Sequence, residues 1–141
     1  MSRRLSLLTW GLVLAAAATG LGQAWMRYLV DPVDDFSAWN HPWQGTTEAL
    51  HAFLGPLTAL GLGLVLAAHA KERVHLPSTT RAAKLGGVVV SGLILALIIS
   101  GSWLTAWPPL DGKLLSWIHG IVGGLFVLGM AGHAWSSKRR G

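Results

Sequence analysis

The sequence predicts an all-α fold, a transmembrane four-helix bundle. The chain of 141 residues is 52% hydrophobic and only 12% charged, whereas about a quarter of the residues of a soluble domain are charged. Four apolar stretches are each long enough to cross a hydrocarbon core of about 30 Å. They cover residues 5–30, 48–70, 85–107 and 114–135. We therefore expect one membrane domain that spans residues 1–141.

Basic and acidic residues occupy different connections between these stretches. Nine of the eleven Lys and Arg lie at the two termini and between the second and third stretches. Five of the six acidic residues lie in the other two connections or at the start of the second stretch. Because positive charge marks the cytoplasmic side, both termini are expected in the cytoplasm. The net charge of +5 thus reflects topology rather than a nucleic-acid surface.

The first stretch, residues 5–30, follows Arg3 and Arg4. This arrangement also occurs in signal peptides, but Gly22-Gln23-Ala24 is a poor cleavage site. A retained helix is favoured because four spans place both termini on the basic side. Arg27 then lies at the outer end, where it either reaches the headgroups or contacts an acidic group of a cofactor.

The connections carry two further histidines. Residues 31–47 form an acidic outer loop in which Trp39 and Trp43 are expected at the membrane interface. His41 in this loop is expected on the surface, and His75 in the basic inner loop is expected in solvent. The third stretch, residues 85–107, contains no histidine and is expected to be a supporting wall.

The second and fourth stretches each carry two histidines. His51 and His69 are eighteen residues apart, which places them on one helix face about 27 Å from each other. His119 and His133 are fourteen residues apart, on one face and about 21 Å from each other. If the spans alternate in direction, His51 meets His119 near the outer surface and His69 meets His133 near the inner one.

We expect the two histidine-bearing helices to be neighbours. The spacings differ by four residues, roughly 6 Å of helix axis. Helix tilt, unequal depths of the histidines or a kink at Pro56 must absorb this difference.

Placing a histidine side chain inside the membrane costs free energy unless the side chain binds a partner. Neutral imidazole is a common axial ligand of haem iron. The chain has no cysteine, which excludes iron–sulfur ligation and covalent haem attachment. The histidine pairs are too far apart for one zinc or copper ion. We predict two haem b groups, one on His51 and His119 and one on His69 and His133. Candidates for contacts to the haem propionates are, outside, Arg27 and Lys113 and, inside, Arg81 and Lys84.

The histidine motifs resemble those of bacterial flavinylation-associated cytochromes and, more loosely, of the cytochrome b561 and hydrogenase b-type cytochromes. They are Glu48-Ala49-Leu50-His51, Leu66-Ala67-Ala68-His69, Ser116-Trp117-Ile118-His119 and Gly132-His133. The resemblance covers residues 5–135 and implies a di-haem electron carrier of the bacterial cytoplasmic membrane. It also implies a partner at the outer face, a flavin-binding protein or c-type cytochrome, and a quinone or cytoplasmic donor.

Other functions compatible with the sequence are a membrane oxidoreductase that reacts with quinone or superoxide at a haem edge, a proton or metal pathway, and a structural or assembly subunit. Histidines that only join helices by hydrogen bonds would not require matched faces and depths on two spans. Apart from a weak similarity between the second and fourth stretches, no internal repeat is evident. The oligomeric state is not predicted.

Overall fold

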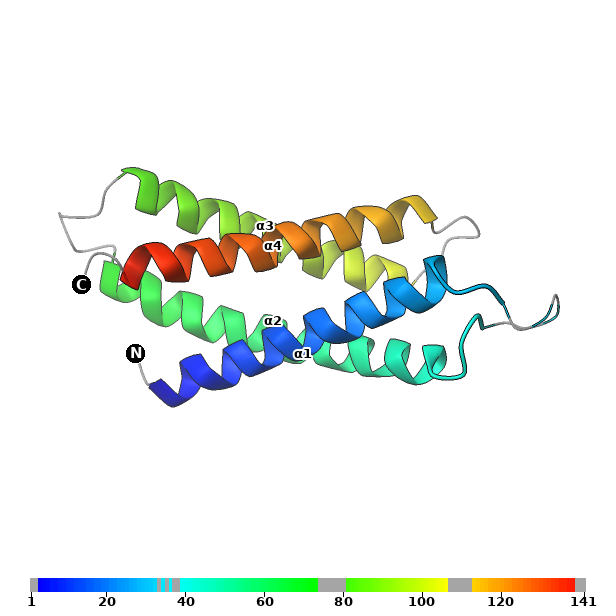
Figure 1. Cartoon of the computed structure of the whole chain (residues 1–141). Helices are drawn as coiled ribbons and strands as arrows, with labels where there is room; N and C mark the ends of the chain where they lie inside the picture. Colours follow the sequence, from blue (N-terminus) through cyan, green and yellow to red (C-terminus); the bar gives the residue numbers. More distant parts are fainter. Residues whose placement is uncertain are drawn as a thin grey trace.

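A computed structural model of the chain confirms the all-α four-helix fold (Figure 1). It describes residues 3–32, 34, 36, 39–73, 81–106 and 113–138. The helices are α1 (Arg3–Tyr28), α2 (Gln44–Arg73), α3 (Arg81–Ala106) and α4 (Lys113–Lys138). Four segments within them, Arg4–Tyr28, Gln44–Ala68, Leu85–Ala106 and Lys113–His133, are long and apolar enough to cross a membrane. The chain is therefore a multi-pass membrane protein.

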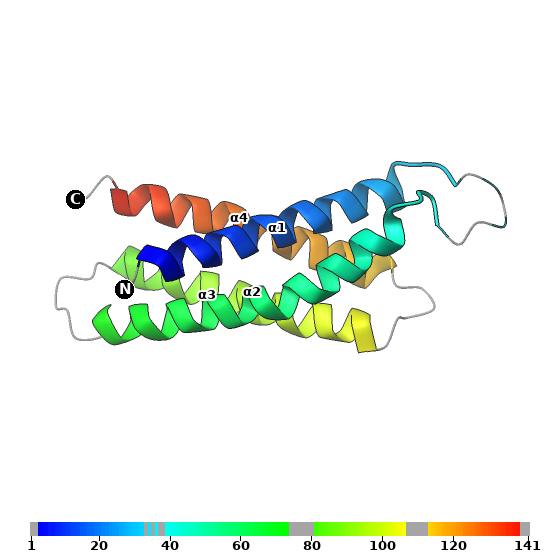
Figure 2. The same ribbon diagram turned by 90° about the horizontal axis from the view of Figure 1, so that it is seen from below.

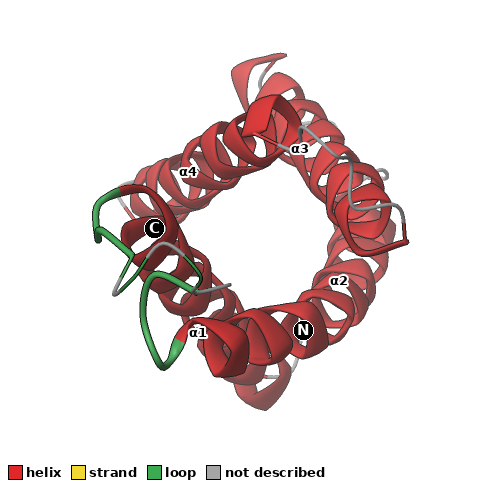
Figure 3. Ribbon diagram, turned by 90° about the vertical axis from the view of Figure 1, so that its right-hand side faces the viewer, coloured by secondary structure: helices red, strands yellow, loops and turns green. Residues whose placement is uncertain are grey.

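The helices run alternately up and down, so α1 begins and α4 ends at the same end of the bundle (Figures 1 and 2). Viewed along the bundle, they occupy the four corners of a square in chain order (Figure 3). α1 packs most closely on α2, and α3 on α4. The expectation that the histidine-bearing helices are neighbours is wrong, because α2 and α4 lie on a diagonal. In an up-and-down bundle, consecutive helices lie side by side, which leaves the second and fourth at opposite corners.

The helices extend beyond the apolar stretches at several ends. α2 begins at Gln44 and continues to Arg73, and α4 continues to Lys138. α4 thus ends three residues beyond the apolar stretch 114–135. Hydropathy marks only the part of a helix that lies in lipid, whereas backbone hydrogen bonds carry the helix into the polar region.

Asn40 closes the connection between α1 and α2. Its side-chain amide donates hydrogen bonds to the carbonyls of Arg27 (3.1 Å) and Val30 (3.0 Å). The Arg27 carbonyl is among those that a helix leaves unpaired at its C-terminal end, and Val30 follows the helix. The Asn40 N–H in turn donates to Oε1 of Gln44 at the start of α2 (3.0 Å). The side chain of Gln44 is buried, so this polar loop fixes how the first helical hairpin turns.

The apolar core lies midway along the bundle. Val13, Leu62 and Phe126 are buried there, and they come from α1, α2 and α4. Phe126 is seven residues from both His119 and His133. The core therefore lies between the two levels at which the sequence places histidines. Large apolar side chains on the outer faces of all four helices are exposed, as lipid contact requires, among them Leu8, Leu60, Val88 and Leu128.

Candidate functional site: a facing histidine pair

His51 and His119 face each other across the bundle. Their ring centroids are 6.1 Å apart and the ring planes are inclined at 85°. His51 is the eighth residue of α2 and His119 the seventh of α4, so both are near the end of the bundle that carries the α1–α2 connection. Both side chains are half-buried. The pairing of these two histidines at one level is thus as the sequence predicts.

The His51 ring is held from behind by α1. Its Nδ1 lies 3.0 Å from the carbonyl oxygen of Ala16 and 3.1 Å from Oγ1 of Thr19. A carbonyl oxygen only accepts hydrogen bonds, so Nδ1 carries the proton. The Thr19 hydroxyl donates to the carbonyl of Ala15 (3.0 Å) and can accept from the imidazole. The lone pair of His51 is therefore on Nε2.

The His119 ring is held in the same way by α3. Its Nδ1 lies 2.8 Å from Oγ of Ser100. The Ser100 hydroxyl donates to the carbonyl of Ala96 in its own helix (2.7 Å), so it accepts from Nδ1–H of His119. The lone pair of His119 is likewise on Nε2. Both histidines are thus oriented as metal ligands commonly are, with one nitrogen fixed by the protein and the other available.

Glycines provide the space in which the two rings lie. A Cβ atom on Gly20 would lie 2.9 Å from Cε1 of His51, and a Cβ atom on Gly101 would lie 3.1 Å from Cε1 of His119. Both distances are shorter than ordinary van der Waals contact. Each glycine directly follows the hydroxyl residue that bonds the same ring, Thr19 in α1 and Ser100 in α3. Each histidine ring therefore lies against a hydroxyl residue and a glycine of the adjacent helix.

The two helical hairpins are equivalent halves of one repeat. Ten residues separate His51 from Gly61 in α2 and His119 from Gly129 in α4. Eleven residues separate Thr9 from Gly20 in α1, and Val90 from Gly101 in α3.

The contacts repeat as well. A Cβ atom on Gly61 would contact Thr9, and one on Gly129 would contact Val90. The likeness lies in these contacts more than in the residue types, so it does not appear as a repeat in the sequence.

The repeat does not extend to the inner pair. In α2 the position equivalent to His133 is Val65, and His69 lies one turn further along. His133 is exposed on α4, and a Cβ atom on Gly86 of α3 would lie 3.9 Å from its Nδ1. The side chains of His69 and Arg81 lie outside the described part of the structure. The pairing of His69 with His133 stays a prediction.

The other predicted site residues lie near the bundle ends. Arg27 and Lys113 are exposed, on the last turn of α1 and the first residue of α4, at the same end as the facing pair. His41 packs against Trp25, with ring centroids 5.8 Å apart, and its Nδ1 accepts a hydrogen bond from the N–H of Trp43. It belongs to the loop and not to the pair. His75 lies outside the described residues, and the side chain of Lys84 lies outside the described side chains.

The facing pair fits a metal held between two imidazoles. A metal–imidazole bond is about 2 Å long, so rings on opposite sides of one ion have centroids about 6 Å apart. The observed 6.1 Å agrees with this arrangement. No third His, Cys, Asp or Glu joins a cluster among the described residues.

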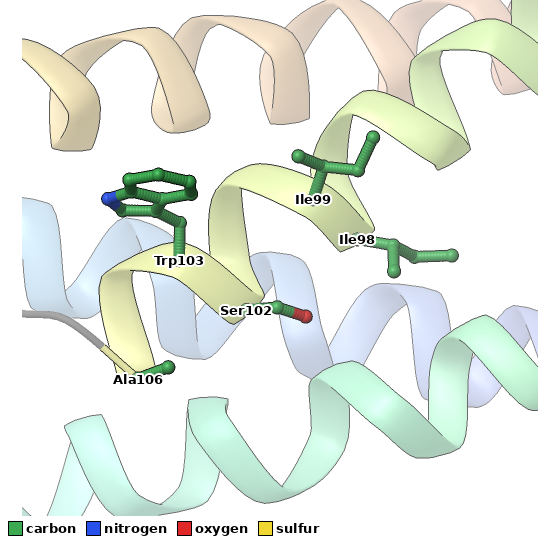
Figure 4. Close-up of a pocket in the computed structure, with 5 residues that line it drawn as sticks. All are labelled: Ile98, Ile99, Ser102, Trp103 and Ala106. Carbon is green, nitrogen blue, oxygen red and sulfur yellow. The ribbon is translucent and has the colours of Figure 1, made fainter.

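The C-terminal half of α3 carries a shallow apolar groove of about 340 Å³. It is lined by Ile98, Ile99, Ser102, Trp103 and Ala106, all from α3 (Figure 4). None of the predicted site residues lines it. Its lining is apolar apart from the Ser102 hydroxyl, as expected of a surface that faces lipid.

No protein-family model, curated protein or solved structure matches the chain. The resemblance to small di-haem cytochromes therefore stays a prediction, and the geometry of the histidine pair is the main guide to function.

Proposed function

We propose that the protein is a transmembrane b-type cytochrome that relays electrons between the two faces of a bacterial cytoplasmic membrane. The observation that carries the proposal is the facing pair, His51 and His119, with both Nδ1 atoms bonded to the protein and ring centroids 6.1 Å apart. These residues would hold the outer haem, and His69 and His133 the inner one. When bound, haem iron supplies reversible one-electron chemistry.

The protein would contribute the ligands of each iron and an apolar layer between the two haems. Two histidines that both coordinated the iron would leave it no open position for oxygen or substrate. The apolar core of Val13, Leu62 and Phe126 lies between the two histidine levels. Electrons can tunnel across such an apolar layer, so the core is compatible with an electron relay between the two levels.

The charge distribution supports an orientation with both termini in the cytoplasm. The facing pair would then be near the outer surface, where the predicted partner is a flavin-binding protein or c-type cytochrome. A quinone or cytoplasmic donor would supply electrons near His69 and His133. Arg27 and Lys113 at the outer end, and Arg81 at the inner end, remain candidates for contacts to the haem propionates.

Substitution of Gly20 by alanine should weaken outer-haem binding by tenfold or more, equivalent to about 1.4 kcal/mol. The new methyl group would displace the His51 ring, which hydrogen bonds to Ala16 and Thr19 hold in place. Alanine also favours helix formation by about 1 kcal/mol over glycine, so haem loss would not come from a weakened helix. The measurement is haem content of the purified protein, from its absorption spectrum.

Gly11→Ala is the matched control in α1, because nothing lies within 4 Å of a Cβ atom there. Gly101→Ala and its control Gly92→Ala form the same comparison in α3. Equal haem content in a variant and its control would contradict the assigned positions of the His51 and His119 rings.

The 85° angle between the imidazole planes predicts an unusual electron paramagnetic resonance spectrum. Perpendicular axial imidazoles bring two iron d orbitals close in energy, so the ferric low-spin signal should show one large g value and strong anisotropy. The spectrum should be recorded on His133→Ala, which is expected to retain only the outer haem. An ordinary rhombic spectrum with three resolved g values would indicate near-parallel rings and contradict the observed geometry.

Vesicles that contain the protein and trapped ferricyanide should oxidise a membrane-impermeant reductant added outside. His133→Ala should reduce this rate to that of vesicles without protein, because the inner haem would be lost. Unchanged transfer would refute the two-haem relay. Rapid reoxidation of the reduced protein by quinone or superoxide alone, with no trapped acceptor, would favour the oxidoreductase instead.

A further inference from the structure

Tyr28 carries a buried hydroxyl group without a hydrogen-bond partner among the described residues. Its ring stacks on Trp117, with centroids 4.9 Å apart and planes inclined at 27°. An unsatisfied buried donor costs about 1–3 kcal/mol. Such a group usually has a partner that is not part of the chain, such as a water molecule or a ligand.

Thr9 has the other buried side-chain oxygen without a partner among the described residues, but its situation differs. A threonine hydroxyl in a helix can turn to a carbonyl of its own preceding turn, as the hydroxyl of Thr19 does. A tyrosine hydroxyl is held at the far end of a rigid ring and cannot reach those carbonyls. Tyr28 therefore has the stronger need of an external acceptor.

The position of Tyr28 relates it to the outer site. Tyr28 ends α1 and is eight residues beyond Gly20, which is about 12 Å along the axis. Trp117 precedes His119 by two residues, about 3 Å along α4. Helical side chains lean towards the N-terminus, so Tyr28 leans back towards the level of the histidine pair and Trp117 leans away from it. The stacked rings consequently lie between that level and the outer end of the bundle.

The chemistry of haem suggests the acceptor. Haem b carries two propionate groups at its rim, and charged carboxylates avoid the apolar middle of a membrane. For a haem on His51 and His119, the apolar core of Val13, Leu62 and Phe126 lies on the inner side, so the propionates belong on the outer side. That side holds the Tyr28 hydroxyl, with Arg27 and Lys113 exposed at the same end.

We propose that the Tyr28 hydroxyl donates a hydrogen bond to a propionate of the outer haem. The inference rests on the proposed function and adds a residue that holds the cofactor by its rim. Trp117 fixes the plane of the phenol ring by stacking, and Arg27 and Lys113 supply positive charge nearby. A hydrogen bond to the propionate reduces its negative field at the iron, so it should favour the ferrous state.

The test is Tyr28→Phe, which keeps the ring and its stacking on Trp117 and removes only the hydroxyl. Tyr28→Phe should lower the ferrous-to-ferric ratio of the outer haem at a fixed potential by up to about fivefold, because only the part of the hydrogen-bond energy that differs between the two oxidation states changes this ratio. Thr9→Val is the matched control, because it removes the other buried hydroxyl without a partner among the described residues, at the mid-bundle level near Gly61. It should leave this ratio unchanged, and both variants should retain two haems.

A second readout identifies the hydroxyl directly. Tyr28 is the only tyrosine in the chain, so every label-sensitive band in a redox-difference infrared spectrum with isotope-labelled tyrosine comes from this residue. We expect such bands when the outer haem changes oxidation state, and we expect none in His119→Ala.

Two haems in the wild type, with no tyrosine bands and an unchanged ratio in Tyr28→Phe, would overturn the role of Tyr28 and leave the proposed function intact. Tyrosine bands that depend on added quinone would assign the hydroxyl to a quinone carbonyl and also overturn the proposal. Absence of haem from the wild type would instead refute the proposed function.

Discussion

The structure depends on one constraint, the need to hold an imidazole in a fixed orientation within lipid. An unpartnered polar nitrogen is costly at membrane depth, and water is not available to satisfy it. The protein meets this constraint with an adjacent helix, which offers a carbonyl or hydroxyl oxygen to Nδ1 of each ring in the facing pair. The hydrogen bond at Nδ1 leaves the lone pair of each ring on Nε2. Helices α1 and α3 therefore do more than enclose the site, because they fix the orientation of the histidines on α2 and α4.

The same constraint explains the glycines and the repeat. An imidazole that bonds to the backbone of a neighbouring helix must lie close against it, and Gly20 and Gly101 allow this approach. Because the two hairpins are arranged alike, the His51 ring of the first and the His119 ring of the second approach each other at the same level of the bundle. The proposed outer haem would be held between these two rings. The core around Phe126 then separates this level from the level of His133 by apolar packing.

The sequence predicts the four helices, their order and the meeting of His51 with His119, because hydropathy and helical periodicity determine these features directly. It does not predict that α2 and α4 are diagonal, since this depends on how four helices close into a square. Nor does it identify Thr19, Gly20 or Ser100 as supports, because they contribute through contacts with another helix. The shared hydroxyl–glycine pairs, Thr19-Gly20 and Ser100-Gly101, are the signal in the sequence that could have revealed them.

The most direct test of the central claim is the number of haems per chain, measured as the pyridine haemochrome of purified protein. The account predicts two haem b groups in the wild type and one in His119→Ala and in His133→Ala. His41→Ala should retain both, because His41 belongs to the outer loop. A wild-type protein without haem, or a His119→Ala variant that keeps two haems, would contradict the account.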